Sequence, residues 1–294
     1  MTFVVGYSPH KDDQGAIELA CQLARSDKGS LYAVTVVPQG WPTVVAGDTD
    51  REFEQWATAE GEASAAESAR ALAAYPDVPS ESGWTTGRSV PQAILDTADR
   101  HQARLIVVGS GENVPSGQIA VTSKTDRLLH SSQLPVAIAP RGYRAGPRAR
   151  VARVTVAFRG DDATWSLLER VAEIAHRASA TVRVVTFAIR GRHMIQAGVG
   201  PAEDLVLERW REQADAEQAK AADRLRNVGF GEDQIECVVA VGRSWGGAVD
   251  ALEWDRGDLL VLGSSSTHRL AAVFLGSSAA KILRNSPVPV IVVP

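Results

Sequence analysis

The sequence has few cysteines. Only two of its 294 residues are cysteines, Cys21 and Cys237. They fall in different halves of the chain, on apolar positions of a predicted helix and a predicted strand. So few cysteines argue against a disulfide framework and indicate a reducing compartment. We therefore expect a cytoplasmic protein in which both cysteines are small buried side chains.

Long apolar runs and a strong net charge are also missing. No run of about 18 apolar residues occurs, so we expect no membrane-spanning helix. The N-terminus enters a predicted strand directly and lacks the basic start and long apolar core of a signal peptide. The formal net charge is -4. This charge gives no reason to expect a nucleic-acid partner or an acidic membrane surface.

Several motifs of enzymes and metal sites are absent. The P-loop pattern Gly-x4-Gly-Lys-Ser/Thr does not occur, nor does a His-x-x-x-His or Cys-x-x-Cys pair. No general base is identifiable beside the Gly/Ser-rich segment described below. We therefore expect a binding or regulatory module rather than an enzyme.

What the chain does contain is a long internal repeat. Leu105–Gly109 aligns with Leu259–Gly263, and Pro135 aligns with Pro289, at a constant offset of 154 residues. The basic, Gly- and Pro-bearing stretch 141–150 lies between the copies, where a solvated linker is favoured over a nucleic-acid patch. We predict a first domain over residues 1–142, a linker over 143–150 and a second domain over 151–294.

Strands and helices are predicted to alternate in both copies. In the first copy we expect strands at 2–7, 30–37, 81–86, 104–109 and 135–139. The helices between them should run from a cap at Asp12 or Asp13 to about Ser26, and over 50–75, 91–101 and 122–131. The second copy should place strands at 153–158, 181–189, 234–241, 258–263 and 289–293, and helices at 162–178, 203–227, 245–256 and 276–285. This alternation predicts an α/β protein with two tandem doubly wound domains, each a five-stranded parallel sheet of order 3-2-1-4-5.

A Gly/Ser-rich loop follows the fourth strand of the second copy. It begins at Gly263 and ends at Gly276-Ser277, where a helical pattern starts. Small side chains and unpaired N–H groups at a helix N-terminus are suited to a phosphate group. In the predicted strand order this loop faces the loop after the first strand, at the switch point where such sheets bind ligands.

The spacing of this loop resembles that of the universal stress protein family. The family pattern is Gly, two residues, Gly, nine residues and Gly-Ser after strand four, and the duplicated chain is similar to the tandem members. The resemblance implies ATP as ligand, with Mg²⁺ left open as its companion ion, and a role in stress response. It also implies that the two domains pair through their fifth strands. A homodimer, an unidentified protein partner and weak ATPase activity are left open.

Carrying the motif over to the second copy gives a mixed result. Gly263, Gly276 and Ser277 match, Ser278 lies beside them, and Ser266 replaces the middle glycine. Arg159 stands where the family has an aspartate after strand one, and it can attract phosphates, fill the pocket or pair with a neighbouring aspartate. Phe187 of the second strand corresponds to the residue beside the base, and Trp245 is a further candidate contact.

The first copy departs further from the motif. Gly109 and Ser123 match, but Glu112 and Thr122 replace the other two glycines. A carboxylate near phosphates repels them by about 1 kcal/mol or more at about 4 Å. We therefore expect ATP mainly in the second domain. The alternative is a partner-binding scaffold with degenerate pockets that bind no nucleotide.

Overall fold

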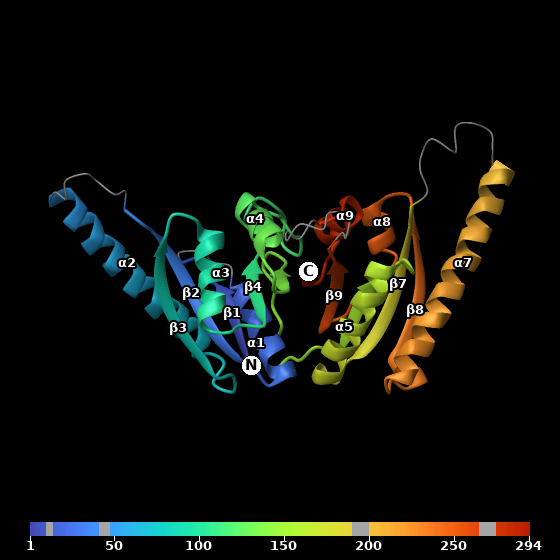
Figure 1. Cartoon of the computed structure of the whole chain (residues 1–294), viewed down its shortest axis with the longest axis horizontal. Coiled ribbons are helices and arrows are strands. Elements are labelled where there is room, and N and C mark those ends of the chain that lie inside the picture. The colour runs from blue at the N-terminus through green and yellow to red at the C-terminus, as the bar shows by residue number, and fades with distance from the viewer. Residues whose placement is uncertain (10–13, 41–47, 190–199, 265–274) are drawn as a thin grey trace. The chain divides into compact units, whose positions relative to one another are not determined.

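The structure is a computed structural model that describes residues 1–9, 14–40, 48–189, 200–264 and 275–294. The chain divides into two compact units, Met1–Ala149 and Arg150–Pro294. Both units alternate strands with helices, as the colours of Figure 1 show along the chain. The predicted α/β fold with two tandem parallel-stranded halves is confirmed. Within the described ranges, no helix is long and apolar enough to cross a membrane.

The first unit contains five parallel strands. They pair in the order β3-β2-β1-β4-β5, so that β1 lies between β2 and β4. Its elements are β1 (Thr2–Gly6), α1 (Gly15–Asp27), β2 (Ser30–Pro38), α2 (Asp48–Leu72), β3 (Ser80–Gly87), α3 (Val90–Arg100), β4 (Leu105–Gly109), α4 (Ser123–Ser131) and β5 (Val136–Ala139).

The second unit repeats this topology. Its strands pair in parallel in the order β8-β7-β6-β9-β10. Its elements are β6 (Arg153–Ala157), α5 (Asp162–Ala178), β7 (Thr181–Ile189), α7 (Gly200–Asn227), the short 3-10 helix η1 (Glu232–Gln234), β8 (Ile235–Gly242), α8 (Trp245–Val249), β9 (Asp258–Gly263), α9 (Ser277–Asn285) and β10 (Val290–Val293).

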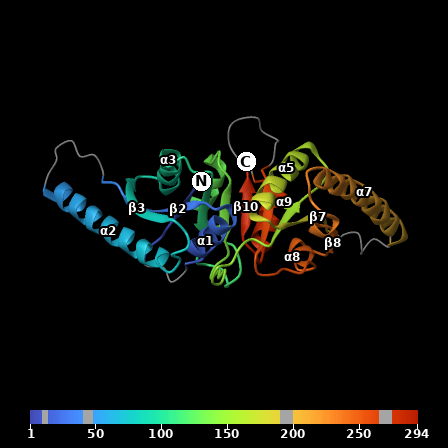
Figure 2. The same cartoon turned by 90° about the horizontal axis from the view of Figure 1, so that it is seen from below.

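The central strands form the core of each unit. All four residues of β5 and all four of β10 are buried, as their unbroken Val/Ile/Ala sequences predict for strands covered on both faces. Helices α1 and α2 pack on one face of the first sheet, and α3 lies on the other (Figure 2). In the second unit α5 packs with α7, and α8 packs with α9.

One of the two cysteines differs from the sequence expectation, and the predicted caps of the first helix lie outside the described residues. Helix α1 begins after Gln14, which makes no side-chain cap, while Asp12 and Asp13 lie outside the described residues. Cys21 is buried as expected, but the expectation for Cys237 is wrong because that residue is exposed. The reason is its position on β8, which pairs with β7 on one side and with no other strand among the described residues of its unit.

Helix α8 is shorter than predicted. The sequence pattern predicts a helix to residue 256, but α8 ends at Val249. The indole N–H of Trp254 donates to the Val249 carbonyl at 3.0 Å. This bond holds the following segment back against the end of the helix, so the chain turns there instead of continuing.

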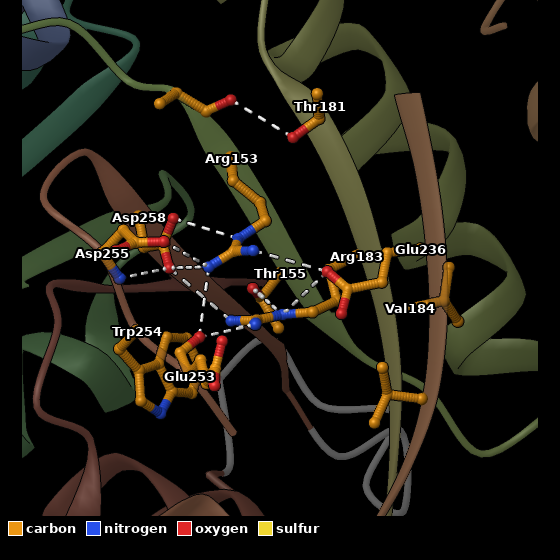
Figure 3. Close-up of polar contacts among 12 residues, drawn as sticks. Arg153, Thr155, Thr181, Arg183, Val184, Glu236, Glu253, Trp254, Asp255 and Asp258 are labelled. Carbon is orange, nitrogen blue, oxygen red and sulfur yellow. Dashed lines mark hydrogen bonds and ion pairs between the residues drawn. The ribbon is translucent and has the colours of Figure 1, made fainter. Parts of the chain in front are cut away.

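The buried guanidinium of Arg183 also holds the segment that follows α8, through Glu253 and Trp254. Arg183 of β7 is 1% exposed and donates to the Glu253 carbonyl at 2.7 Å and the Thr155 hydroxyl at 3.1 Å (Figure 3). Its guanidinium lies 4.6 Å from the centre of the Trp254 ring, within the range of a cation–π contact. Burial, together with the charge of Arg153, lowers the pKa of Arg183.

The segment predicted as a solvated linker is partly fixed to the first unit. The hydroxyl of Tyr143 donates to the Gln22 side chain of α1 at 2.6 Å. The N–H of Ala145 donates to the Glu18 carboxylate of the same helix at 3.3 Å. Residues after 140 therefore belong, at least as far as Ala145, to the packed surface of the first unit.

Candidate functional site

A cavity in the second unit brings most of the predicted site residues together. It has a volume of about 240 Å³ and lies where β6 and β9 end and where α5 and α9 begin. Its lining includes the predicted residues Arg159, Phe187, Gly263, Gly276, Ser277 and Ser278. The cavity therefore occupies the switch point, because the order of the strands reverses between β6 and β9.

The beginning of α5 positions one wall of this cavity. Asp161 caps the helix by accepting from the N–H of Thr164 at 3.0 Å, and the Thr164 hydroxyl accepts from the N–H of Asp161 at 3.1 Å. This reciprocal capping box satisfies two N–H groups and fixes the turn after β6. Thr164 also lines the cavity, although sequence reasoning did not select it. The Asp-x-x-Thr spacing at a helix start was the signal that could have found it.

Arg159 is held at the rim of the cavity by the same cap. Its guanidinium donates to the Asp161 carboxylate at 2.6 Å, and the side chain is 67% exposed. Partial burial disfavours the ionised form of Asp161, but the hydrogen bonds from Thr164 and the charge of Arg159 outweigh it and lower the pKa. Of the three roles considered for Arg159, the pairing with a neighbouring aspartate is the one present in this structure.

The N-terminus of α9 forms the opposite wall. The N-cap residue Gly276 makes no side-chain cap within the described part of the chain. Its backbone angles (φ -57°, ψ 154°) suit any residue, so glycine here supplies space rather than a special conformation. The first N–H groups of the helix thus face the cavity without a capping side chain from the N-cap residue, and the helix dipole is positive there.

The corresponding helix in the first unit is capped. The hydroxyl of Thr122 accepts from the N–H of Thr125 at 3.2 Å at the start of α4. Thr122 stands where the second unit has Gly276, so the same helix end is satisfied by protein in one unit and left without this cap in the other. The first-unit residues Gly109 and Ser123 nevertheless line a cavity of their own, of about 340 Å³.

The loop after β4 closes on itself. The N–H of Gly111 donates to the Ala120 carbonyl at 3.1 Å, and the N–H of Ala120 donates to the Ser110 hydroxyl at 2.7 Å. Arg141 ties the same loop down, because its guanidinium donates to the carbonyls of Glu112 at 2.7 Å and Val114 at 2.6 Å. Two backbone donors of this loop, the N–H groups of Gly111 and Ala120, are therefore already used by the protein.

The segment around Ser244 matches a sequence pattern of hydrolase nucleophiles, and the conformation of this serine decides whether it forms a nucleophile elbow. The segment Gly242-Arg-Ser-Trp-Gly246 joins β8 to α8 with the Gly-x-Ser-x-Gly spacing of a hydrolase nucleophile elbow. The backbone of Ser244 is extended (φ -149°, ψ 168°) rather than strained, and its hydroxyl accepts from the N–H of Gly247 at 3.1 Å. Ser244 is therefore the N-cap of α8.

Comparison with known proteins identifies the fold and the repeat together. The model of the universal stress protein family matches residues 1–140 and again residues 151–294. The chain belongs to the universal stress protein family. A universal stress protein of Mycobacterium tuberculosis is 38% identical over 296 residues, with 100% of both chains covered. A universal stress protein of Mycobacterium bovis has the same identity and coverage.

Solved structures share the fold of the whole tandem chain. A universal stress protein from Archaeoglobus fulgidus superposes with a TM-score of 0.64 at 16% identity, covering 99% of this chain and 97% of its own. A functionally unknown protein from Pseudomonas aeruginosa gives a TM-score of 0.57 at 16% identity, covering 99% of this chain and 92% of its own. At these identities the likeness establishes the fold alone.

Within this universal stress protein, the described residues form no metal site. No group of three or more His, Cys, Asp or Glu side chains is placed to hold a metal ion in the described ranges. Ser266, the predicted middle position of the loop, lies outside the described residues. Trp245, the further candidate from the sequence, lines the second-unit cavity beside Phe187.

Proposed function

We propose that this universal stress protein is a stress-response regulatory module that binds ATP in the cavity of its second unit. One observation carries the proposal. A single cavity collects the small residues at the end of β9, the start of α9, which has no side-chain cap among the described residues, and an aromatic ring on β7. The first two suit phosphate groups, and the ring suits a flat base.

The residues present fit the proposed ligand in shape and in hydrogen-bonding groups. Arg159, the one charged residue among the described lining, is paired with the Asp161 carboxylate, and the described lining holds no carboxylate that would repel phosphates. Gly276, Ser277 and Ser278 would hold the phosphates through N–H and hydroxyl groups, and Phe187 would lie along the nucleoside. Because the described residues form no acidic cluster, a Mg²⁺ ion would enter with the phosphates rather than wait in a protein site.

Thermal unfolding of the full chain with and without ATP tests this proposal. ATP at millimolar concentration should raise the midpoint, because a ligand that binds only the folded state stabilises it. Gly276→Glu should abolish the rise, since a carboxylate would occupy the phosphate position. The matched control is Thr122→Glu at the equivalent position of the first unit, which should keep the ATP effect. No rise in the unsubstituted chain would refute the proposal.

The alternative is a partner-binding scaffold in which nucleotide binding has been lost. The loop of the first unit favours it for that half of the chain, because the protein itself occupies the donors of Gly111 and Ala120. Affinity purification from the native cell with and without ATP separates the two functions. Partners that bind equally in both conditions support the scaffold. Pairing of the two units through their fifth strands stays a prediction from the resemblance.

A further inference from the structure

The cavities of the two units differ at several wall residues, one of which lies on the second strand of each unit. The pairing of β1 with β2 places Val34 beside Gly6, and the pairing of β6 with β7 places Val185 beside Ala157. Two residues further on, Val36 and Phe187 therefore hold equivalent positions, and both line their cavities. The cavity with valine at this position has a volume of about 340 Å³, and the cavity with phenylalanine has about 240 Å³.

This cavity has the size and walls of a small-molecule site. Its volume falls at the lower end of the range for ligand pockets, about 300–1,000 Å³. Apolar side chains from two strands and from α3 form its interior: Val34, Val36, Val90, Pro91, Ile94 and Val108. The exposed hydroxyl-bearing residues Ser8 and Ser123 stand at its mouth. Such a cavity suits a flat, largely apolar ligand that carries a few hydroxyl or amine groups.

Part of the donor set at the phosphate end of the same cavity is already used by the protein. The N–H groups of Gly111 and Ala120 are used within the loop, and Thr122 caps the N–H of Thr125 at the start of α4. A phosphate that bound these three N–H groups would have to displace these bonds, and each one broken without replacement costs about 1 kcal/mol.

The charge of the lining points the same way. Glu112 and Lys124 are the two charged residues among the described lining of the first cavity, so their formal charges cancel. The second cavity is lined by Arg159, whose partner Asp161 lies outside the lining, and by no carboxylate among its described residues. Among the described linings, a polyanion would therefore meet a repelling carboxylate, that of Glu112, only in the first cavity.

We propose that the first unit holds a second, separate ligand site that selects an uncharged nucleoside-type molecule and rejects its phosphorylated form. The choice of a nucleoside rests on the proposed ATP site, because the two cavities are equivalent in the repeat. The apolar chamber receives the base and sugar, and the self-bonded loop takes the place of the phosphates. A chain built in this way binds two related ligands through two copies of one fold.

Calorimetric titration of the full chain with adenosine and with ATP tests the selectivity. In the Gly276→Glu chain, adenosine should still bind, and ATP should bind at least about tenfold more weakly, a difference of about 1.4 kcal/mol. ATP binding as tight as adenosine binding, or no adenosine binding at millimolar concentration, would overturn the proposal. These titrations do not depend on whether ATP stabilises the unsubstituted chain, so the two proposals fail separately.

Val36→Trp assigns the adenosine site to the first cavity. The indole is larger than the phenyl ring that the second cavity holds at the equivalent position, so it should fill the chamber and remove one equivalent of adenosine per chain. The variant is made in the Gly276→Glu chain, and that chain without the second substitution is the reference that should keep the equivalent. Circular dichroism checks folding, and Ser8→Trp at the exposed mouth covers the same chamber if Val36→Trp does not fold. Adenosine stoichiometry unchanged in a folded filling variant contradicts the assignment.

Discussion

The guanidinium of Arg159 donates a 2.6 Å hydrogen bond to the carboxylate of Asp161, the residue that caps helix α5. One carboxylate thus serves the helix N-terminus through one oxygen and the cation at the cavity rim through the other. The cap therefore also sets the direction of the arginine side chain at the rim. Stability of the helix start and charge of the candidate site are therefore linked through a single side chain.

Replacement of Asp161 should separate these two roles. Asp161→Ala removes the cap and should lower the free energy of unfolding by about 1 kcal/mol. Asp161→Asn keeps a capping oxygen and should cost less. Urea denaturation of both variants measures the difference, and equal losses would contradict the capping role.

Asp161 should also make stability depend on pH in the acid range. Its folded-state pKa is lowered, so its ionisation contributes stability above the unfolded value of about 3.9. That contribution is lost as the pH falls from there through the lower folded-state pKa. Denaturation at about pH 6 and at about pH 3 should therefore show a smaller acid loss for Asp161→Asn than for the unsubstituted chain. An identical acid loss in both chains would show that Asp161 does not contribute.

Asp258 forms a charge cluster with Arg153 and Arg183 (Figure 3). Loss of the Asp258 carboxylate should destabilise this cluster more than loss of any other acidic side chain in it. Its side chain is 1% exposed and accepts from Arg153 at 2.6 and 3.1 Å, with Arg183 at 3.6 Å. Asp258→Ala leaves two guanidinium groups without their shared buried carboxylate, and it should cost about 3–5 kcal/mol.

Asp255 provides the matched control for this cluster. It lies 3.6 Å from Arg153, but its side chain is 82% exposed. Asp255→Ala should therefore change the free energy of unfolding by no more than about 0.5 kcal/mol. Urea denaturation compares the two variants. Similar losses for both would mean that burial does not set the strength of these ion pairs.

The two cysteines should react at very different rates in the folded protein. Cys21 is 0% exposed, and burial raises its pKa to about 12. Cys237 is exposed, although partial desolvation raises its pKa as well. A thiol reagent should therefore modify one cysteine in the native chain and both in urea. The Cys237→Ser chain should show no fast native reaction, and rapid modification of Cys21 would contradict its burial.

Much of the fold could be read from local patterns. The strands end close to their predicted limits because short Val/Leu/Ile runs stop at glycines, as at Gly109 and Gly263. The repeat and the frame of Gly263, Gly276 and Ser277 also lie entirely in the sequence. Neighbouring residues determine these features through propensity and spacing, so no distant contact is needed to predict them.

Other features depend on residues far apart in the chain. Helix α8 ends early because the segment after it is held by Trp254 and by Arg183, about 70 residues upstream. The loop after β4 is held by Arg141, which lies 29 residues after Glu112 and 27 residues after Val114, the residues whose carbonyls it binds. Local patterns contain no information on such contacts, which explains why the predicted helix was too long.

The sequence by itself determined the family motif, the tandem α/β order and the better-preserved loop of the second half. Only the tertiary structure decided that Arg159 pairs with Asp161, that Thr122 caps α4, and that Val36 and Phe187 line equivalent cavities of unequal volume. The physical reason is that a motif depends on spacing along one segment. The charge, donors and volume of a cavity depend on side chains that strand register and helix packing bring together.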